Sequence, residues 1–357
     1  MSESKNSGSS DSDEEKYSDD SFDHEDSPHK NISPTTTRIT SPRNSSNKDT
    51  ITQTPSPKQP PPKPDFEESA WQSIEFDQIE LNEQIGGGGV GLVYKGYFED
   101  SPVALKTLFD PKVNEDLKQE FMDELLIMSQ VNHPNIVAFY GACLTAPNLC
   151  FVMELCKCSL FDLLHKNSND SFSKYQRVDW CCQIAAGMKY LHAQIPPIVH
   201  RDIKSQNILI SEADEQIKLC DFGLVRTKTS SAGTPNYMPP ELFLGLPFSK
   251  AVDVYAFALV MHEIFTQELP FQSYDADDIR RNVIGGTRPE IPTLDVPFDC
   301  QEIIRLGWDG DPKRRPNFDE IYERLLAVLE ETPKRSALEE LEICGGGSEL
   351  DSLSDFM

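Results

Sequence analysis

A run of glycines at residues 85–96, IGGGGVGLVYKG, is the first feature of this sequence that could do chemistry, because such loops often hold phosphate groups. A Walker loop would end in Gly-Lys-Ser or Gly-Lys-Thr, whereas Leu92 and Val93 follow Gly91. A dinucleotide-binding loop would open a helix, whereas residues 92–98 have the composition of a strand. The pattern therefore favours a third scheme, in which a glycine hairpin between two strands brings backbone N–H groups close to phosphates.

A lysine and a glutamate follow this loop at positions where they could act together. Lys106, in the segment VALK, lies on the next predicted strand, where its cation could reach the phosphates of a nucleotide. Glu124 lies on the helix predicted over residues 113–131, in the same register as the apolar Met128. An ion pair between them would hold Lys106 in position while its charge remains available to the nucleotide.

Two further motifs, HRDIKSQN at residues 200–207 and DFG at residues 221–223, make the chain resemble the protein-kinase superfamily. The glycine spacing also fits the kinase pattern G-x-G-x-x-G-x-V, and four motifs follow one another in the expected order. The resemblance implies that Asp202 orients the attacking hydroxyl and accepts its proton, and that Lys204 neutralises the moving phosphoryl group. It also implies that Asn207 and Asp221 bind Mg²⁺.

The resemblance further implies an ATP site between two lobes. Met153 would lie behind the adenine, and backbone groups of Glu154 and Cys156 would hydrogen-bond to it. Val93, Ala104 and Leu209 are similar to the residues that enclose the base, while Ser159 and Asp162 lie where ribose contacts are often made. The expected ATP-binding residues are Ile85, Gly86, Gly87, Gly88, Gly89, Val90, Gly91, Val93, Ala104, Lys106, Met153, Glu154, Cys156, Ser159, Asp162 and Leu209.

The elements that must position these residues can be read from the hydrophobic pattern. Short runs rich in β-branched and aromatic residues predict five strands, at residues 79–85, 91–98 and 101–109 and in the segments IVAFYGACL and NLCFVMEL. Beyond Ser159 the pattern becomes helical, with helices predicted at 160–164, 178–192, 250–266, 277–283, 299–308 and 317–330. We therefore expect an α+β, two-lobed protein-kinase fold, with a small β-rich N-lobe (71–153) that carries one helix, a hinge (154–158) and a large α-rich C-lobe (159–332).

Three residues of the second half resemble structural anchors of the kinase fold. In NYMPPE, Pro239 replaces the usual alanine, but Glu241 can still pair with Arg315. Asp253 resembles the residue that braces the catalytic loop, and Ala258 stands where a glycine is common.

The acceptor hydroxyl is indicated by two residues. Lys204 together with Thr234 matches the serine/threonine pattern, in which the Thr234 hydroxyl bridges Asp202 and Lys204. The spacing from Trp308 to Phe318 resembles the tyrosine-kinase-like group, whose members are mostly serine/threonine-specific. Dual specificity stays open, and a pseudokinase scaffold is a third reading, although Lys106, Asp202 and Asp221 are all present.

Regulation is predicted from the segment between DFG and GTP. Arg201 could receive a phosphate placed there, which would add charge beside the catalytic loop and order the segment. The candidate phosphorylation sites are Thr227, Thr229, Ser230 and Ser231.

The composition restricts location and partners. A formal net charge of −26 argues against non-specific nucleic-acid or anionic-lipid binding and is compatible with basic protein substrates. The nine cysteines lack metal or disulfide spacing, which suggests reduced thiols. We see no signal peptide, myristoylation site or apolar span, so we expect a cytoplasmic protein without a transmembrane segment.

Both ends of the sequence differ from the middle. Residues 1–70 are acidic and rich in Ser and Pro, and residues 333–357 are acidic, so we expect two disordered tails around a kinase domain at 71–332. Within the first tail, QPPPKP at residues 59–64 could form a polyproline II ligand for an SH3-type partner, or a stiff spacer.

Overall fold

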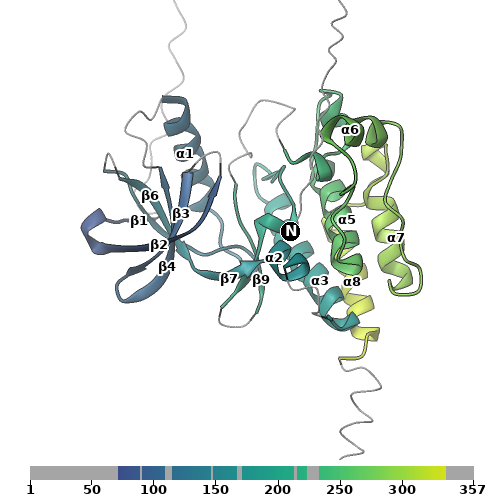
Figure 1. Cartoon of the computed structure of the whole chain (residues 1–357), viewed down its shortest axis with the longest axis horizontal. Coiled ribbons are helices and arrows are strands. Elements are labelled where there is room, and N and C mark those ends of the chain that lie inside the picture. The colour runs from purple at the N-terminus through teal and green to yellow at the C-terminus, as the bar shows by residue number, and fades with distance from the viewer. Residues whose placement is uncertain are drawn as a thin grey trace, which may run out of the picture. The chain divides into compact units, whose positions relative to one another are not determined.

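The computed structural model describes residues 71–88, 91–108, 115–145, 148–166, 171–212, 215–222 and 233–334. The chain divides into two units, Met1–Lys63 and Pro64–Met357, and all described residues lie in the second unit. Within that unit, a strand-rich part is followed by a helix-rich part (Figure 1). The expected α+β, two-lobed kinase fold is thus confirmed, whereas the two predicted tails, apart from Pro333 and Lys334, lie outside the described residues.

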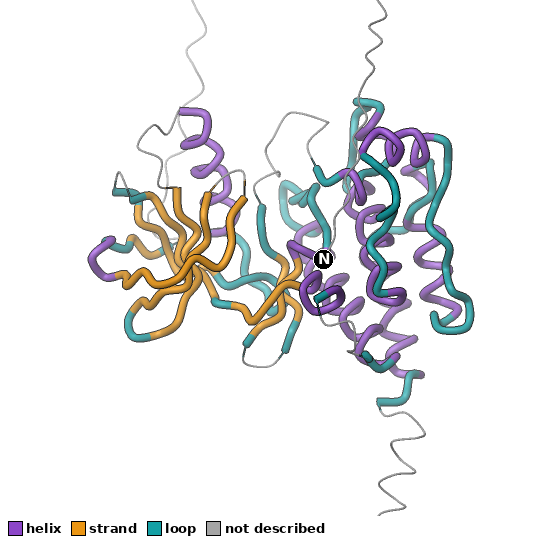
Figure 2. The backbone as a smooth tube through the Cα atoms, in the orientation of Figure 1, coloured by secondary structure: helices purple, strands orange, loops and turns teal. Residues whose placement is uncertain are grey.

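The N-lobe contains a six-stranded sheet with the order β1-β5-β6-β4-β3-β2. Figure 2 shows the strands in orange. Its strands are β1 (Gln72–Ser73), β2 (Ile79–Gly88), β3 (Gly91–Phe98), β4 (Ser101–Leu108), β5 (Phe139–Cys143) and β6 (Leu149–Glu154). All neighbours pair antiparallel except β1, which runs parallel to β5. The antiparallel register sets Val93 opposite Lys106, and Lys106 opposite Phe151.

One helix, α1 (Glu115–Met128), packs against this sheet. Its buried Phe121 stacks on Phe151 of β6, with ring centroids 4.0 Å apart. Leu125 is buried in the same cluster. Because Glu124 lies three residues after Phe121, on the same side of α1, this packing brings its carboxylate to the sheet face that carries Phe151 and Lys106.

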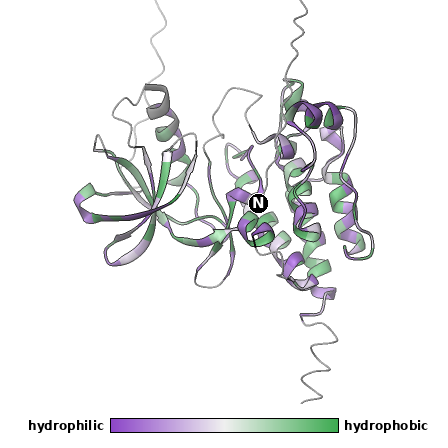
Figure 3. Ribbon diagram, in the orientation of Figure 1, coloured by the Kyte–Doolittle hydropathy of each residue, from purple (hydrophilic) through white to green (hydrophobic). Residues whose placement is uncertain are grey.

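The C-lobe is mainly helical. It contains α2 (Leu160–His165), α3 (Lys174–His192), α4 (Pro240–Phe243), α5 (Ala251–Thr266), α6 (Ala276–Ile284), α7 (Phe298–Gly307) and α8 (Phe318–Glu331), and a small sheet of β7 (Cys156–Ser159), β8 (Ile208–Ser211) and β9 (Ile217–Leu219). Every residue of α5 from Val252 to Phe265 is buried. This helix is predominantly apolar along its length (Figure 3) and forms the centre around which the other elements pack.

Four short elements were not predicted from the sequence: β1, α4, β7 and β8. The segment expected as the hinge contains the end of β6 and the start of β7, and only Leu155 lies between the two strands. The reason is that Cys156 pairs with Ser211 of β8, which extends the small sheet toward the N-lobe. Four 3-10 turns complete the described chain: η1 (Phe76–Gln78), η2 (Ser205–Asn207), η3 (Pro235–Tyr237) and η4 (Pro312–Arg314).

Candidate active site

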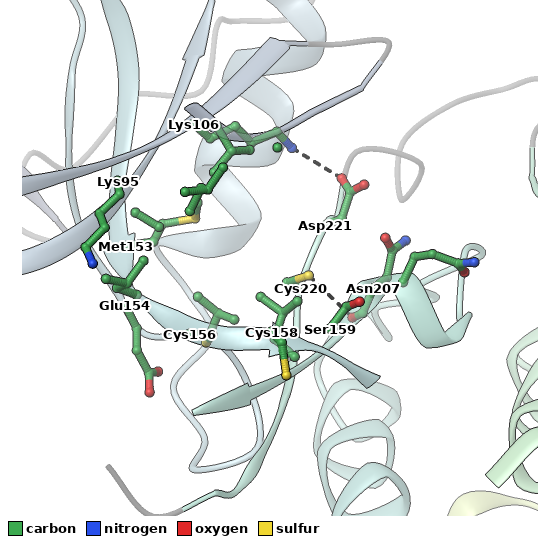
Figure 4. Close-up of a pocket in the computed structure, with 18 of the residues that line it drawn as sticks. Lys95, Lys106, Met153, Glu154, Cys156, Cys158, Ser159, Asn207, Cys220 and Asp221 are labelled. Carbon is green, nitrogen blue, oxygen red and sulfur yellow. Dashed lines mark hydrogen bonds and ion pairs between the residues drawn. The ribbon is translucent and has the colours of Figure 1, made fainter. Parts of the chain in front are cut away.

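A cavity of about 770 Å³ lies between the two lobes. Figure 4 shows Lys106 reaching across it from the sheet toward Asp221. The cavity is lined by most residues expected from the sequence, namely Ile85, Gly86, Gly87, Gly91, Val93, Ala104, Lys106, Glu124, Met153, Glu154, Cys156, Ser159, Asp162, Lys204, Asn207, Leu209, Asp221 and Thr234. Gly88 ends β2, and Gly89 and Val90 lie outside the described residues.

The glycine hairpin is formed by the ends of β2 and β3. Gly91 has a φ of +152°, and a Cβ atom there would lie only 2.3 Å from the carbonyl oxygen of Thr107. This position therefore requires glycine. At Gly86, in contrast, a Cβ would meet nothing closer than Val93 Cβ at 3.6 Å, so steric crowding within the chain does not explain that glycine.

Lys106 contacts two carboxylates. Its Nζ lies 2.6 and 2.8 Å from the two oxygens of Glu124 and 3.2 Å from Asp221 Oδ1. Burial opposes the lysine charge, but the two carboxylates outweigh burial and raise the pKa of Lys106 above its usual value. The ammonium thus stays charged near neutral pH, and the ion pair expected between Lys106 and Glu124 is present.

Asp202, Lys204 and Thr234 form a triangle of hydrogen bonds. Lys204 Nζ donates to Asp202 Oδ2 at 2.7 Å and to Thr234 Oγ1 at 2.9 Å, and Thr234 Oγ1 donates to Asp202 Oδ1 at 3.2 Å. The Asp202 side chain is 12% exposed, although Asp202 itself is not among the cavity-lining residues. The triangle brings a carboxylate and a cation together beside the cavity.

A buried aspartate on α5 holds the loop that carries Asp202. Asp253 is fully buried and accepts hydrogen bonds from the backbone N–H groups of His200 (2.9 Å) and Arg201 (2.7 Å). His192 Nε2 lies 2.8 Å from the same carboxylate. These contacts fix Arg201 at a φ of +69°, a conformation that residues other than glycine rarely adopt.

Asn207 and Asp221 present oxygen atoms suited to Mg²⁺. The Asn207 side-chain nitrogen donates to Asp202 O (2.9 Å) and Oδ2 (3.0 Å), which directs its Oδ1 away from these contacts. Asp221 is 45% exposed at the cavity and has a φ of +66°. One carboxylate and one amide oxygen, with phosphate oxygens and waters, match the ligands that Mg²⁺ prefers, so the residues fit this ion.

The opposite end of the cavity is bounded by the connection between the lobes. The Glu154 N–H donates to Ala138 O (2.9 Å), so a nucleotide contact through this backbone would use the Glu154 carbonyl. The Glu154 carboxylate lies 3.1 Å from Lys218 Nζ on β9. Ser159 Oγ accepts from the Asp162 N–H at 3.0 Å and caps α2, so part of its hydrogen-bonding capacity serves the helix.

Several lining residues were not identified from the sequence: Glu83, Lys95, Met128, Val137, Leu155, Lys157, Cys158, Gln206, Glu212 and Cys220. For Lys95 a signal existed, because it is two residues after Val93 on a strand and so shares the face of Val93. Figure 4 shows its side chain extending along the cavity wall.

The candidate phosphorylation sites Thr227, Thr229, Ser230 and Ser231 lie outside the described residues. Arg201, their predicted partner, is 5% exposed, and its guanidinium lies 4.4 Å from the centre of the Phe248 ring. The regulatory pairing stays a prediction.

The pair predicted between Glu241 and Arg315 is present as a bidentate contact. Arg315 Nη1 and Nη2 donate to the two Glu241 oxygens at 2.6 and 2.9 Å, and both side chains are almost completely buried. The replacement of alanine by Pro239 thus leaves this anchor intact.

The two lobes thus bring a cation, two carboxylates and a glycine hairpin together around one cavity. Comparison with known proteins gives the family. The model of protein tyrosine and serine/threonine kinases matches residues 79–325, and the chain belongs to this family.

Individual relatives agree with this assignment. Mitogen-activated protein kinase kinase kinase 10 of Xenopus laevis is 39% identical over 277 residues, which cover 71% of this chain and 27% of the relative. Its human counterpart is 37% identical over 276 residues, covering 72% of this chain and 28% of that protein. Serine/threonine-protein kinase STY17 of Arabidopsis thaliana is 35% identical over 269 residues, covering 73% and 46%. The chain therefore spans less than half the length of these relatives.

Proposed function

We propose that this chain is an ATP-dependent protein kinase that transfers the γ-phosphate of ATP to serine and threonine hydroxyls of proteins in intracellular signalling. The observation that carries the proposal is the triangle of Asp202, Lys204 and Thr234, which joins a proton acceptor to a cation. The relative from Arabidopsis thaliana is itself named a serine/threonine-protein kinase.

In this proposal each residue has one task. Asp202 orients the acceptor hydroxyl and takes its proton, and Lys204 neutralises charge on the phosphoryl group as it moves. Lys106 binds the phosphates, and Glu124 holds the ammonium of Lys106 in place at 2.6 Å. The backbone of the glycine hairpin covers the phosphates, and Val93, Ala104 and Leu209 enclose the base.

Asn207 and Asp221 would hold Mg²⁺, which neutralises phosphate charge when bound. The contact of 3.2 Å between Asp221 and Lys106 supports this assignment, because it places the candidate ligand beside the cation that is to meet the same phosphates.

Two alternatives to a serine/threonine kinase are a pseudokinase scaffold, which transfers no phosphate, and a dual-specificity kinase, which also accepts tyrosine. A pseudokinase scaffold typically lacks one of the residues that correspond to Lys106, Asp202 and Asp221, and all three are present here. Dual specificity would retain this machinery and add tyrosine as an acceptor. The bridging contact of Thr234 favours serine and threonine.

The remaining assignments are parts of the same proposal. We assign the protein to the cytoplasm, with basic protein substrates, no nucleic-acid partner and an SH3-type partner for residues 59–64. None of the helices in the described ranges is long and apolar enough to cross a membrane. Phosphorylation at Thr227, Thr229, Ser230 or Ser231 would activate the enzyme through Arg201.

The test is phosphorylation of a mixed peptide library with γ-labelled ATP and Mg²⁺, followed by phosphoamino-acid analysis. We expect phosphoserine and phosphothreonine. Phosphotyrosine in comparable amount would support dual specificity, and an absence of transfer would support the scaffold.

A further inference from the structure

One carboxylate in the C-lobe is completely buried and has no task in the mechanism above. Glu263 lies on α5 and is 0% exposed, among residues that are otherwise almost all apolar. Burying an ionised carboxylate is costly unless several donors surround it. The hydrogen-bond donors around Glu263 therefore identify the segments of the chain that this carboxylate positions.

Three side chains donate to or contact Glu263. Ser205 Oγ donates to Oε1 at 2.7 Å, and Tyr237 Oη donates to Oε2 at 2.7 Å. His165 Nε2, on α2, lies 2.8 Å from Oε1. The hydroxyl groups of Ser205 and Tyr237 are also 3.2 Å apart, so these two residues and Glu263 form a closed ring of hydrogen bonds.

The two hydroxyl donors belong to the two segments that form the acceptor site. Ser205 directly follows Lys204, and Tyr237 ends the 3-10 turn that begins one residue after Thr234. Lys204 and Thr234 contact one another at 2.9 Å in front of Asp202. The same two segments are thus joined twice, once at the cavity and once behind it at Glu263.

We infer that Glu263 is a positioning residue, which fixes the acceptor hydroxyl of the protein substrate by holding Ser205 and Tyr237, and through them Lys204 and Thr234, against α5. The inference rests on the proposed function. It assigns Glu263 to the acceptor side of the site, because none of its three partners among the described residues is one that we assign to nucleotide binding.

The ionisation of the partners agrees with this arrangement. Burial, and then the carboxylate of Glu263, raise the pKa of Tyr237, so its hydroxyl remains a hydrogen-bond donor at all ordinary pH values. The hydrogen bond from Tyr237 to Glu263 therefore does not change with pH near neutrality.

The test compares Tyr237→Phe, Ser205→Ala and the double variant with a matched control. Tyr255→Phe is that control, because Tyr255 is also fully buried, lies on α5 and has a hydroxyl with no hydrogen-bond partner among the described residues. For each protein, kcat and KM are measured for a peptide and for ATP.

We expect Tyr237→Phe and Ser205→Ala each to lower kcat for peptide phosphorylation roughly tenfold, the effect of losing one hydrogen bond to a charged group. KM for ATP should change less than about twofold, because none of the residues assigned to nucleotide binding is altered. The double variant should lose less than the product of the single effects, because both hydroxyls act on one carboxylate.

A fall in kcat no larger than that of Tyr255→Phe would overturn the inference, as would a rise in KM for ATP that matches the fall in kcat. If the wild-type chain transferred no phosphate to any peptide, the proposed function would fail, and the inference with it. The two failures are therefore distinguishable.

Discussion

At the scale of single residues, charge is controlled by pairing in a partly buried cleft. Lys106 is 17% exposed and Glu124 4% exposed, so neither charge would be tolerated alone. The pairing serves both: it stabilises the two ions and points the ammonium into the cavity. The state of Lys106 thus depends on Glu124.

Replacement of Glu124 by Gln should make activity sensitive to alkaline pH. With the carboxylate removed, burial still opposes the lysine charge and only Asp221 supports it, so the pKa of Lys106 falls. The protonated, phosphate-binding form is then lost as the pH rises. We expect kcat/KM for ATP of the variant to decline between about pH 7 and pH 10, where the wild-type ammonium, with its raised pKa, remains charged.

Glu302→Gln is the control for this profile, because Glu302 forms an exposed pair with Arg305, remote in sequence from every cavity-lining residue. Parallel profiles for Glu124→Gln and the wild type would contradict the role given to the pair.

At the scale of elements, the packing of α5 against α7 depends on small residues. A Cβ atom built at Gly307 would lie 2.8 Å from Ala258 Cβ and 3.4 Å from Val254 O. Ala258, where related kinases often have glycine, is accommodated because Gly307 faces it. The space between the two facing positions thus holds the methyl group of Ala258 and no second one.

Gly307→Ala should therefore destabilise the C-lobe by about 1–3 kcal/mol through overpacking. Adding Ala258→Gly should recover part of this loss, since it restores the space. Gly310→Ala is the matched control, because a Cβ there meets nothing within 4 Å. Urea denaturation would measure the free energies of unfolding, and additive effects of the two substitutions would contradict the expected coupling between these positions.

The longer elements were predictable because they repeat a pattern. The strands of the N-lobe and the helices of the C-lobe extend over several periods of hydrophobic alternation, and their predicted ranges agree with the structure to within a few residues. In contrast, β1 has two residues and α4 has four, so each covers only about one period and its pattern never repeats. The strand β7 exists because Cys156 pairs with Ser211, a contact between residues far apart in sequence.

The same distinction applies to the candidate site. Lys106, Asp202 and Asp221 stand in local motifs and could be named from the sequence, although their roles stay proposals. Glu263 has no motif of its own, because its partners Ser205 and Tyr237 reach it from segments 58 and 26 residues away. Only the folded chain shows which buried carboxylate serves the acceptor site.

At the scale of the whole molecule, contacts between distant segments hold the C-lobe together. The pair of Glu241 and Arg315 joins residues 74 positions apart, and Arg315 also donates to Asp309 O and Ala251 O. Its guanidinium lies 5.0 Å from the centre of the Tyr255 ring. One side chain thus connects α4, α5 and the segment before α8.

Arg315→Ala should lower the free energy of unfolding by about 3–5 kcal/mol, because it leaves the buried carboxylate of Glu241 without a partner. Arg305→Ala, which breaks an exposed pair with Glu302, should cost at most about 1 kcal/mol. Chemical denaturation of both variants checks the comparison. Similar losses of unfolding free energy in the two variants would mean that the buried pair stabilises the C-lobe no more than the exposed pair does.

The account as a whole depends on Asp202 as the group that accepts the proton of the acceptor hydroxyl. The most direct measurement is the transfer of labelled phosphate from ATP to peptide by the wild type and by Asp202→Asn, with nucleotide binding measured in parallel. We predict that the variant binds nucleotide as before while its rate of transfer falls by a factor of about 10² to 10⁴, the usual contribution of general acid–base catalysis. Equal transfer by the two proteins would contradict the account.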